Sequence, residues 1–104
     1  MNNLCYNILI KQVTCQNGVP RIVNNTYSNI KVGTIIQLSF GYTIKITAIN
    51  DSNIEIMLSN PNYISDIYFT IPISSYKQFN LPKENGTLRV YVGIVSYDCC
   101  CNNN

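Results

Sequence analysis

The chain has 104 residues, of which 46% are hydrophobic and 12% are charged, a composition that can form one core and is not that of a charged disordered chain. The net charge of +2 comes from scattered single Lys and Arg residues, which excludes a nucleic-acid footprint, and the absence of histidine excludes imidazole chemistry. With 16 Ile, 16 Asn, 8 Tyr and one alanine, the sequence favours strands and turns over helices.

Predicted strands follow one another along the chain, separated by turn signals rich in Asn, Gly and Pro. The segment 16–20, with Asn17-Gly18, is a strong turn signal, and Glu84-Asn85-Gly86 leads into the last strand. The polar segment 25–29 is predicted to be a loop, and Pro82 is expected to stop a strand. The strands expected from apolar alternation are 4–14, 21–24, 34–40, 42–49, 54–58, 66–73, 76–81 and 87–97.

The clearest pair of strands is 34–40 and 42–49, with Gly41 at the bend. Within 42–49, the alternation predicts that Ile44, Ile46 and Ala48 share one face. Seven or eight closely spaced strands predict an all-β chain, folded as a single β-sandwich or jelly roll. We expect one domain over residues 1–104, with a short amino-terminal arm and a cysteine-rich tail at 98–104.

Two predicted strand segments, 34–40 and 64–73, carry almost no charge. Exposed strand edges are usually protected by lysine, and these segments have none. We therefore expect at least one edge to be covered by main-chain pairing with a neighbouring subunit.

The amino end, Met1 to Asn7, has no cationic segment ahead of an apolar one, so a Sec signal peptide is not expected. No segment approaches the roughly 18 apolar residues that a membrane-spanning helix needs. We expect no membrane span.

The five cysteines are the most informative residues of the chain. Cys5 and Cys15 lie ten residues apart on or at the end of the first strand, and so on one face if that strand is regular. The other three, Cys99, Cys100 and Cys101, are consecutive and precede a polar end. Three consecutive cysteines on a polar tail cannot all be buried.

Three interpretations of these cysteines are open: reduced thiols of a cytosolic protein, a zinc cluster formed by Cys5, Cys15 and the tail, and disulfides. The absence of Cys-x-x-Cys spacing and of histidine disfavours zinc, and exposed free thiols are reactive. An odd number leaves one cysteine without a partner in a monomer, which favours intermolecular bonds. We expect a tail cysteine to pair with Cys5 or Cys15 of an adjacent subunit. Cys15, beside a turn, is the better candidate for any intrachain bond.

A small all-β chain rich in Asn, Ile and Tyr, with cysteines at both ends and no signal peptide, resembles the disulfide-linked spore-appendage and spore-coat subunits of Gram-positive spore formers. In appendage fibres, jelly-roll subunits stack by strand augmentation and are joined by disulfides from an amino-terminal connector. The resemblance implies a self-assembling structural subunit at an extracellular or spore surface. It covers architecture and no motif: the family's adjacent cysteines are amino-terminal, whereas Cys99-Cys100-Cys101 is carboxyl-terminal, so no pairing is carried over.

Catalytic motifs are missing from the sequence, and the acidic residues are isolated from one another. These acidic residues are Asp51, Glu55, Asp66, Glu84 and Asp98. We therefore predict that the chain is not an enzyme and requires neither a cofactor nor a metal.

Tyrosines in or beside the predicted loops point to an alternative function. Together with Asn amides, flat Tyr rings are typical of a carbohydrate-binding face, although Tyr is also common in strands and protein interfaces. The tyrosines concerned are Tyr27, Tyr42, Tyr63, Tyr68 and Tyr76. The alternative is a lectin-like or phage-associated β-sandwich that binds carbohydrate.

Overall fold

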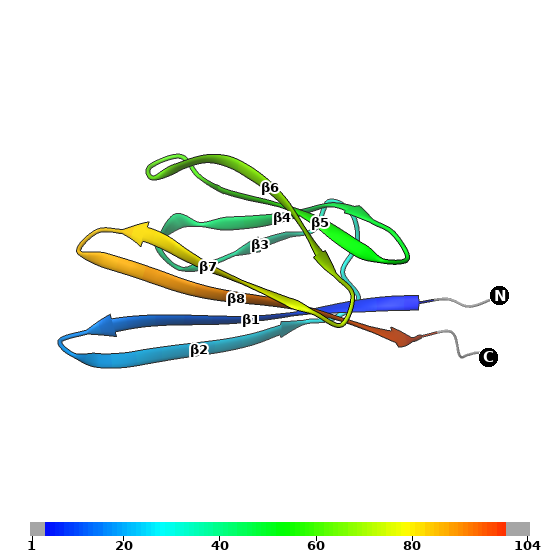
Figure 1. Cartoon of the computed structure of the whole chain (residues 1–104), viewed down its shortest axis with the longest axis horizontal. Coiled ribbons are helices and arrows are strands. Elements are labelled where there is room, and N and C mark those ends of the chain that lie inside the picture. Colours follow the sequence, from blue (N-terminus) through cyan, green and yellow to red (C-terminus); the bar gives the residue numbers. More distant parts are fainter. Residues whose placement is uncertain (1–3, 100–104) are drawn as a thin grey trace.

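Alternating apolar residues form two antiparallel four-stranded sheets in a computed structural model that describes residues 4–99 (Figure 1). One sheet, here called sheet A, has the order β2-β1-β8-β7, and sheet B has the order β3-β4-β5-β6. The strands are β1 (Leu4–Gln16), β2 (Val19–Tyr27), β3 (Ile35–Gln37), β4 (Thr43–Ile49), β5 (Asn53–Asn60), β6 (Ile64–Pro72), β7 (Tyr76–Lys83) and β8 (Gly86–Asp98), with one 3-10 turn, η1 (Ser39–Gly41).

The prediction of an all-β sandwich is confirmed, and the strand order decides between the two expected architectures. Sheet B is a meander of consecutive hairpins, and sheet A joins two hairpins through the antiparallel pairing of β1 with β8. A jelly roll alternates consecutive strands between its two sheets through Greek-key connections, whereas here β1 and β2, β3 to β6, and β7 and β8 are neighbours within one sheet. The fold is therefore a sandwich.

The core lies between the facing sides of the two sheets. Sheet A contributes alternate residues of β1 and β8, and sheet B contributes alternate residues of β4 and β5. The fully buried residues include Ile8, Ile44, Ile46, Ile54, Ile56, Leu58, Ile71, Leu88, Val90, Val92 and Ile94. Because β5 alternates without exception from Asn53 to Asn60, the apolar pattern expected over 54–58 is confirmed.

Several predicted boundaries were wrong. The expected loop at 25–29 is strand as far as Tyr27, because β2 pairs with β1 over its whole length at a sheet edge, where its Asn side chains remain in solvent. The expected strand 34–40 is strand only over Ile35–Gln37, because Phe40 (φ 61°) and Gly41 (φ 83°) turn the chain in a left-handed conformation. The strand expected at 66–73 begins earlier, at Ile64.

Proline did not stop β7 as expected. Pro82 lies within β7 and pairs with Thr87. Since β7 is an edge strand, the missing N–H of proline need not break the sheet. Pro20 in β2 and Pro72 in β6 also lie in edge strands.

The predicted face of β4 is also corrected at one residue. A bulge between Ile46 and Ala48 shifts the register, so Ile49 rather than Ala48 packs against the core. The Thr47 hydroxyl fills the bulge by donating to the carboxylate and the main-chain oxygen of Glu55.

Buried polar groups fix the turn between β3 and β4 against the rest of the sandwich. The side-chain oxygen of Gln12 accepts a bond of 2.7 Å from the Ser39 N–H, and the Asn60 amide donates to the Phe40 carbonyl at 3.0 Å. The fully buried Tyr42 donates its hydroxyl to the Pro82 carbonyl of the opposite sheet. Burial raises the pKa of Tyr42, with a further contribution from Tyr63.

Candidate functional site at the two poles of the sandwich

Strand β1 places two of the cysteines at opposite ends of the molecule. Cys5 lies at the start of β1, and Cys15 lies near its end, beside the β1–β2 turn. Ten residues of strand span about 33 Å, in a molecule whose longest extent is 51 Å. In Figure 1 the start of β1 and the end of β8 lie at one end, here called the tail pole, and the β1–β2 and β7–β8 hairpins lie at the other, here called the hairpin pole.

The tail pole contains a disulfide bond between Cys5 and Cys99, whose Cα atoms are 5.6 Å apart. Antiparallel pairing of β1 with β8 places Cys5 opposite Tyr97, so Cys99 follows β8 within reach. The intrachain bond uses Cys5 and Cys99, so the expectation that Cys15 is the better intrachain candidate is wrong. Because Cys5 and Cys99 are bonded to each other, neither is available for the expected bond to a neighbouring subunit. Cys5 and Cys99 meet because the first and last strands, β1 and β8, are neighbours in sheet A.

The hairpin pole presents Cys15 as an exposed free thiol. It lies beside a hollow of about 270 Å³ that is also lined by Asn85 of the β7–β8 turn and by Thr87 and Arg89 from the start of β8. A second hollow of about 470 Å³ adjoins Cys15 where the two hairpin turns meet, and Lys83 and Glu84 line it. The thiol is therefore accessible at the tip of the molecule. Cys100 and Cys101 lie outside the described residues.

The zinc alternative that joins Cys5 and Cys15 in one cluster is contradicted. The two residues lie at opposite poles, and Cys5 is already bonded to Cys99. Within residues 4–99, no group of three or more potential metal ligands lies together.

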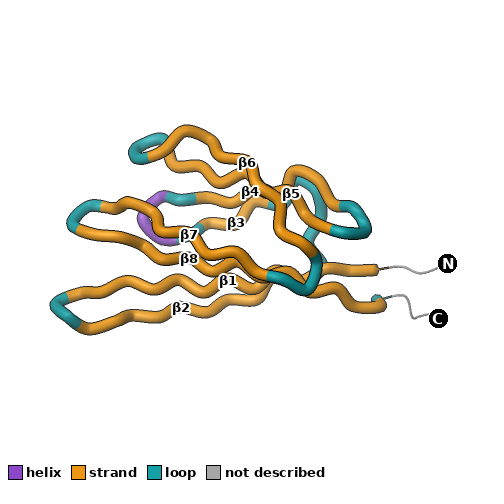
Figure 2. Tube along the Cα trace, in the orientation of Figure 1, coloured by secondary structure: helices purple, strands orange, loops and turns teal. Residues whose placement is uncertain are grey.

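A large shallow hollow, of about 580 Å³, also lies at the tail pole beside the Cys5–Cys99 bond. Its lining includes Asn29, Lys31 and Val32 from the connection between β2 and β3. Both poles therefore carry hollows, and the β1–β2 and β7–β8 turns lie side by side at the hairpin pole, as the tube in Figure 2 shows.

The tyrosines proposed for a carbohydrate-binding face do not form one surface. Tyr42 is buried and stacks on Tyr63 with ring centroids 6.2 Å apart. Tyr68 is exposed on β6, whereas Tyr76 is exposed on β7 of the other sheet. Tyr76 lies beside Tyr91 on the outer face of sheet A, with the two ring centroids 6.3 Å apart. Sequence reasoning missed Tyr91 because the contact depends on the pairing of β7 with β8.

No protein-family model, no curated protein and no solved structure matches this chain. Over residues 4–99, the structure contains no helix with the length and apolar character needed to cross a bilayer.

Proposed function

We propose that this chain is a structural, non-catalytic subunit that assembles head to tail through intermolecular disulfides, in a fibre or coat at an extracellular or spore surface. The bonds would join Cys15 of one copy to Cys100 or Cys101 of the next. One observation carries the proposal: the free thiol of Cys15 lies at the pole opposite the Cys5–Cys99 bond.

Chain geometry supports a head-to-tail link. Cys99 is bonded to Cys5 at the tail pole, and Cys100 and Cys101 are the next two residues of the sequence. A disulfide between Cys15 of one copy and a tail cysteine of the next joins two different surfaces. The resulting dimer still has a tail cysteine at one end and a Cys15 at the other. Such heterologous contacts build open chains unless their rotation closes a ring.

The shape of the two poles also supports end-to-end contact. The β1–β2 hairpin ends in a turn at Asn17 and Gly18, which adopt the left-handed φ values of 52° and 78°. The hollow of about 580 Å³ at the tail pole offers the next copy a concave surface close to the cysteines.

The sheet edges support further pairing between copies. Strands β3 and β6, which lie within the two low-charge segments 34–40 and 64–73, form the two edges of sheet B. On β6 the only charged residue is Asp66, and Ile67 and Tyr68 are exposed. An edge with so little charge is poorly protected against pairing with a second chain. Main-chain pairing along β6 would hold copies in register beside the disulfides.

Replacing Cys15 tests the covalent link. We expect the full chain, after oxidation, to give a ladder of multimers on non-reducing electrophoresis, and we expect Cys15→Ser to remove it. Non-reducing peptide mapping should identify Cys15 bonded to Cys100 or Cys101. A mixture of Cys15→Ser with Cys100→Ser/Cys101→Ser should yield heterodimers, because each variant retains one half of the link.

Gln16→Ser is the matched control, since Gln16 is the exposed neighbour of Cys15. The ladder should survive this change. Multimers that persist unchanged in Cys15→Ser, or mapping that shows every Cys15 bonded to another Cys15, would refute the head-to-tail arrangement.

Charging the β6 edge tests the pairing between copies. Tyr68 and Thr70 are both exposed on this strand, so Tyr68→Lys/Thr70→Lys should leave the monomer folded. We expect this variant, in the Cys15→Ser background, to remain monomeric at concentrations where the parent self-associates in sedimentation velocity. The control is Tyr68→Phe/Thr70→Val, which keeps the strand uncharged. Equal self-association of the charged and control variants would exclude β6 as the pairing edge.

A further inference from the structure

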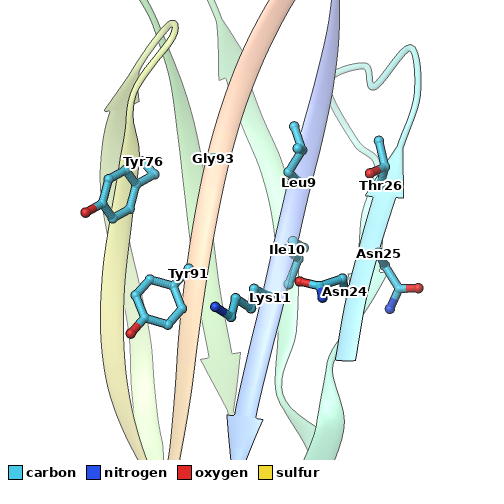
Figure 3. A pocket seen from close by; sticks show the side chains of 9 residues that line it. All are labelled: Leu9, Ile10, Lys11, Asn24, Asn25, Thr26, Tyr76, Tyr91 and Gly93. Carbon is cyan, nitrogen blue, oxygen red and sulfur yellow. The ribbon is translucent and has the colours of Figure 1, made fainter. Parts of the chain in front are cut away.

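The outer face of sheet A carries a hollow of about 310 Å³ that the proposed assembly does not use (Figure 3). Its floor is Gly93 in β8. Gly93 pairs with Leu9 of β1 on one side and with Tyr76 of β7 on the other. Because the glycine has no side chain, its two larger neighbours stand on either side of an open space.

The hollow exists because residue 93 has no side chain. The backbone conformation at this position does not require a glycine. A Cβ at this position would meet the Tyr76 Cβ at 3.5 Å, an ordinary contact distance. Gly93 lies in the middle of a strand, where glycine is unfavourable relative to β-branched residues. The absent side chain therefore costs stability and leaves room for a ligand.

Two tyrosine rings form the wall of the hollow. Tyr76 is 68% exposed, and its ring lies 6.3 Å from that of Tyr91 at an interplanar angle of 44°. Figure 3 shows both rings on the same side of Gly93, across from Leu9 and the side chains of β2. An exposed ring of this kind offers a flat apolar surface with a polar hydroxyl at its end.

Polar groups stand on the opposite side of the hollow. Asn24 and Thr26 of β2 pair with Lys11 and Leu9, and so lie on the outer face. Within residues 4–99, neither side chain makes a hydrogen bond, so the amide of Asn24 and the hydroxyl of Thr26 keep their bonding capacity.

The charge on this face is entirely positive. The ammonium of Lys11 lies 5.4 Å from the centre of the Tyr91 ring, and Arg89 lies on the same face, opposite Val13. None of the five acidic residues lies on this outer face of sheet A. Two are in turns and two are in sheet B, and Asp98 lies on the opposite face of β8 from its neighbour Tyr97, which is on the outer face. An anionic ligand would meet no repulsion.

We propose that this hollow binds a pyranose ring of an acidic polysaccharide. The apolar C–H face of the sugar packs on Tyr76 above Gly93, the sugar hydroxyls bond to Asn24 and Thr26, and Lys11 binds the carboxylate. A largely apolar lining with a few placed polar groups is typical of small-ligand sites. A charge-assisted bond from Lys11 gives the preference for an acidic sugar.

A second copy of the chain fits this surface less well. A two-fold contact between two such faces would bring Lys11 and Arg89 of both copies into one interface without an acidic residue to offset them, and like charges in one interface oppose association. The charge pattern therefore favours an anionic ligand over self-association here.

Titration of the full chain with hyaluronan hexasaccharide, which alternates glucuronate and N-acetylglucosamine, tests the proposal. Chitohexaose, a neutral chain of N-acetylglucosamine of the same length, is the matched ligand. We expect saturable binding of the acidic hexasaccharide, followed by amide shifts of Lys11, Tyr76 and Gly93 in NMR spectra. Chitohexaose should bind about tenfold more weakly, equivalent to about 1.4 kcal/mol.

Three variants separate the contributions to binding. Gly93→Val should abolish binding by filling the floor, while the thermal midpoint stays the same or rises. Tyr76→Ala should weaken binding about tenfold, and Lys11→Gln should remove the preference for the acidic ligand. The controls are Tyr68→Ala and Lys45→Gln, which change exposed residues of sheet B and should leave binding unchanged.

Three results would overturn the proposal. They are the absence of saturable binding, equal affinity for the two hexasaccharides, and unchanged binding by folded Gly93→Val. Amide shifts at Gly93 that follow protein concentration without glycan would instead identify a second copy as the occupant. Cys15 lies four residues along β1 from Lys11 and does not line this hollow. Loss of the multimer ladder in Cys15→Ser and loss of glycan binding in Gly93→Val are therefore independent outcomes.

Discussion

The Cys5→Ser/Cys99→Ser variant is expected to lose about 4–5 kcal/mol of unfolding free energy, because the bond it removes joins distant parts of the chain. The two cysteines are 94 residues apart in sequence, so the disulfide closes a loop that includes nearly every described residue. In the chain-entropy model, a cross-link of this span strongly restricts the unfolded ensemble. A 104-residue domain has a total stability of only about 5–15 kcal/mol, so the variant should be close to unfolding.

Denaturant unfolding curves of the double variant and of the oxidised parent provide the measurement. Cys15→Ser is the control, because it removes an exposed thiol that makes no intrachain bond, and its unfolding free energy should stay within about 0.5 kcal/mol of the parent's. A double variant as stable as this control would show that β1 and β8 hold the chain ends together without the bond.

Ile56→Ala should lower the free energy of unfolding by about 2–5 kcal/mol, since it leaves a cavity in the core. Ile56 is fully buried in β5 and pairs with Ile46 on one side and Phe69 on the other. These neighbours belong to paired strands, which restricts how far the site can collapse. Chemical denaturation measures this loss of unfolding free energy as a lower midpoint with an unchanged m-value.

Ile22→Ala makes the same chemical change at a surface position. Ile22 is 55% exposed on the edge strand β2, so its replacement should change stability by no more than about 0.5 kcal/mol. If the two substitutions had equal effects, Ile56 would not be part of a tightly packed core.

The Cys5–Cys99 bond has a mechanical consequence in the proposed fibre. A covalent path from Cys15 to the tail follows β1 back to Cys5 and crosses the disulfide to Cys99. Because β1 is already extended, tension along this path cannot lengthen the subunit by unfolding the other strands. The bond would therefore transmit force between subunits while the rest of the sandwich carries none of it.

Elements with a local signal could be predicted from the sequence. The alternation in 54–58 fixed which side of β5 faces the core, and Asn17-Gly18 and Asn85-Gly86 mark the hairpin turns at one pole. The low charge of 34–40 and 64–73 indicated edges, and both segments contain edge strands of sheet B. Such features depend on neighbouring residues alone.

Features that depend on long-range pairing could not be predicted in this way. The disulfide partner of Cys5 and the contact of Tyr76 with Tyr91 both follow from the register of β8 against its neighbours. The hollow over Gly93 has the same origin, since a glycine in a strand becomes the floor of a site only when larger residues flank it across the sheet. The sequence by itself determined an all-β chain with turns and low-charge edges, because periodicity and turn chemistry act locally. Only the tertiary structure decided which cysteines meet and which thiol is left free, because these depend on β1 lying beside β8.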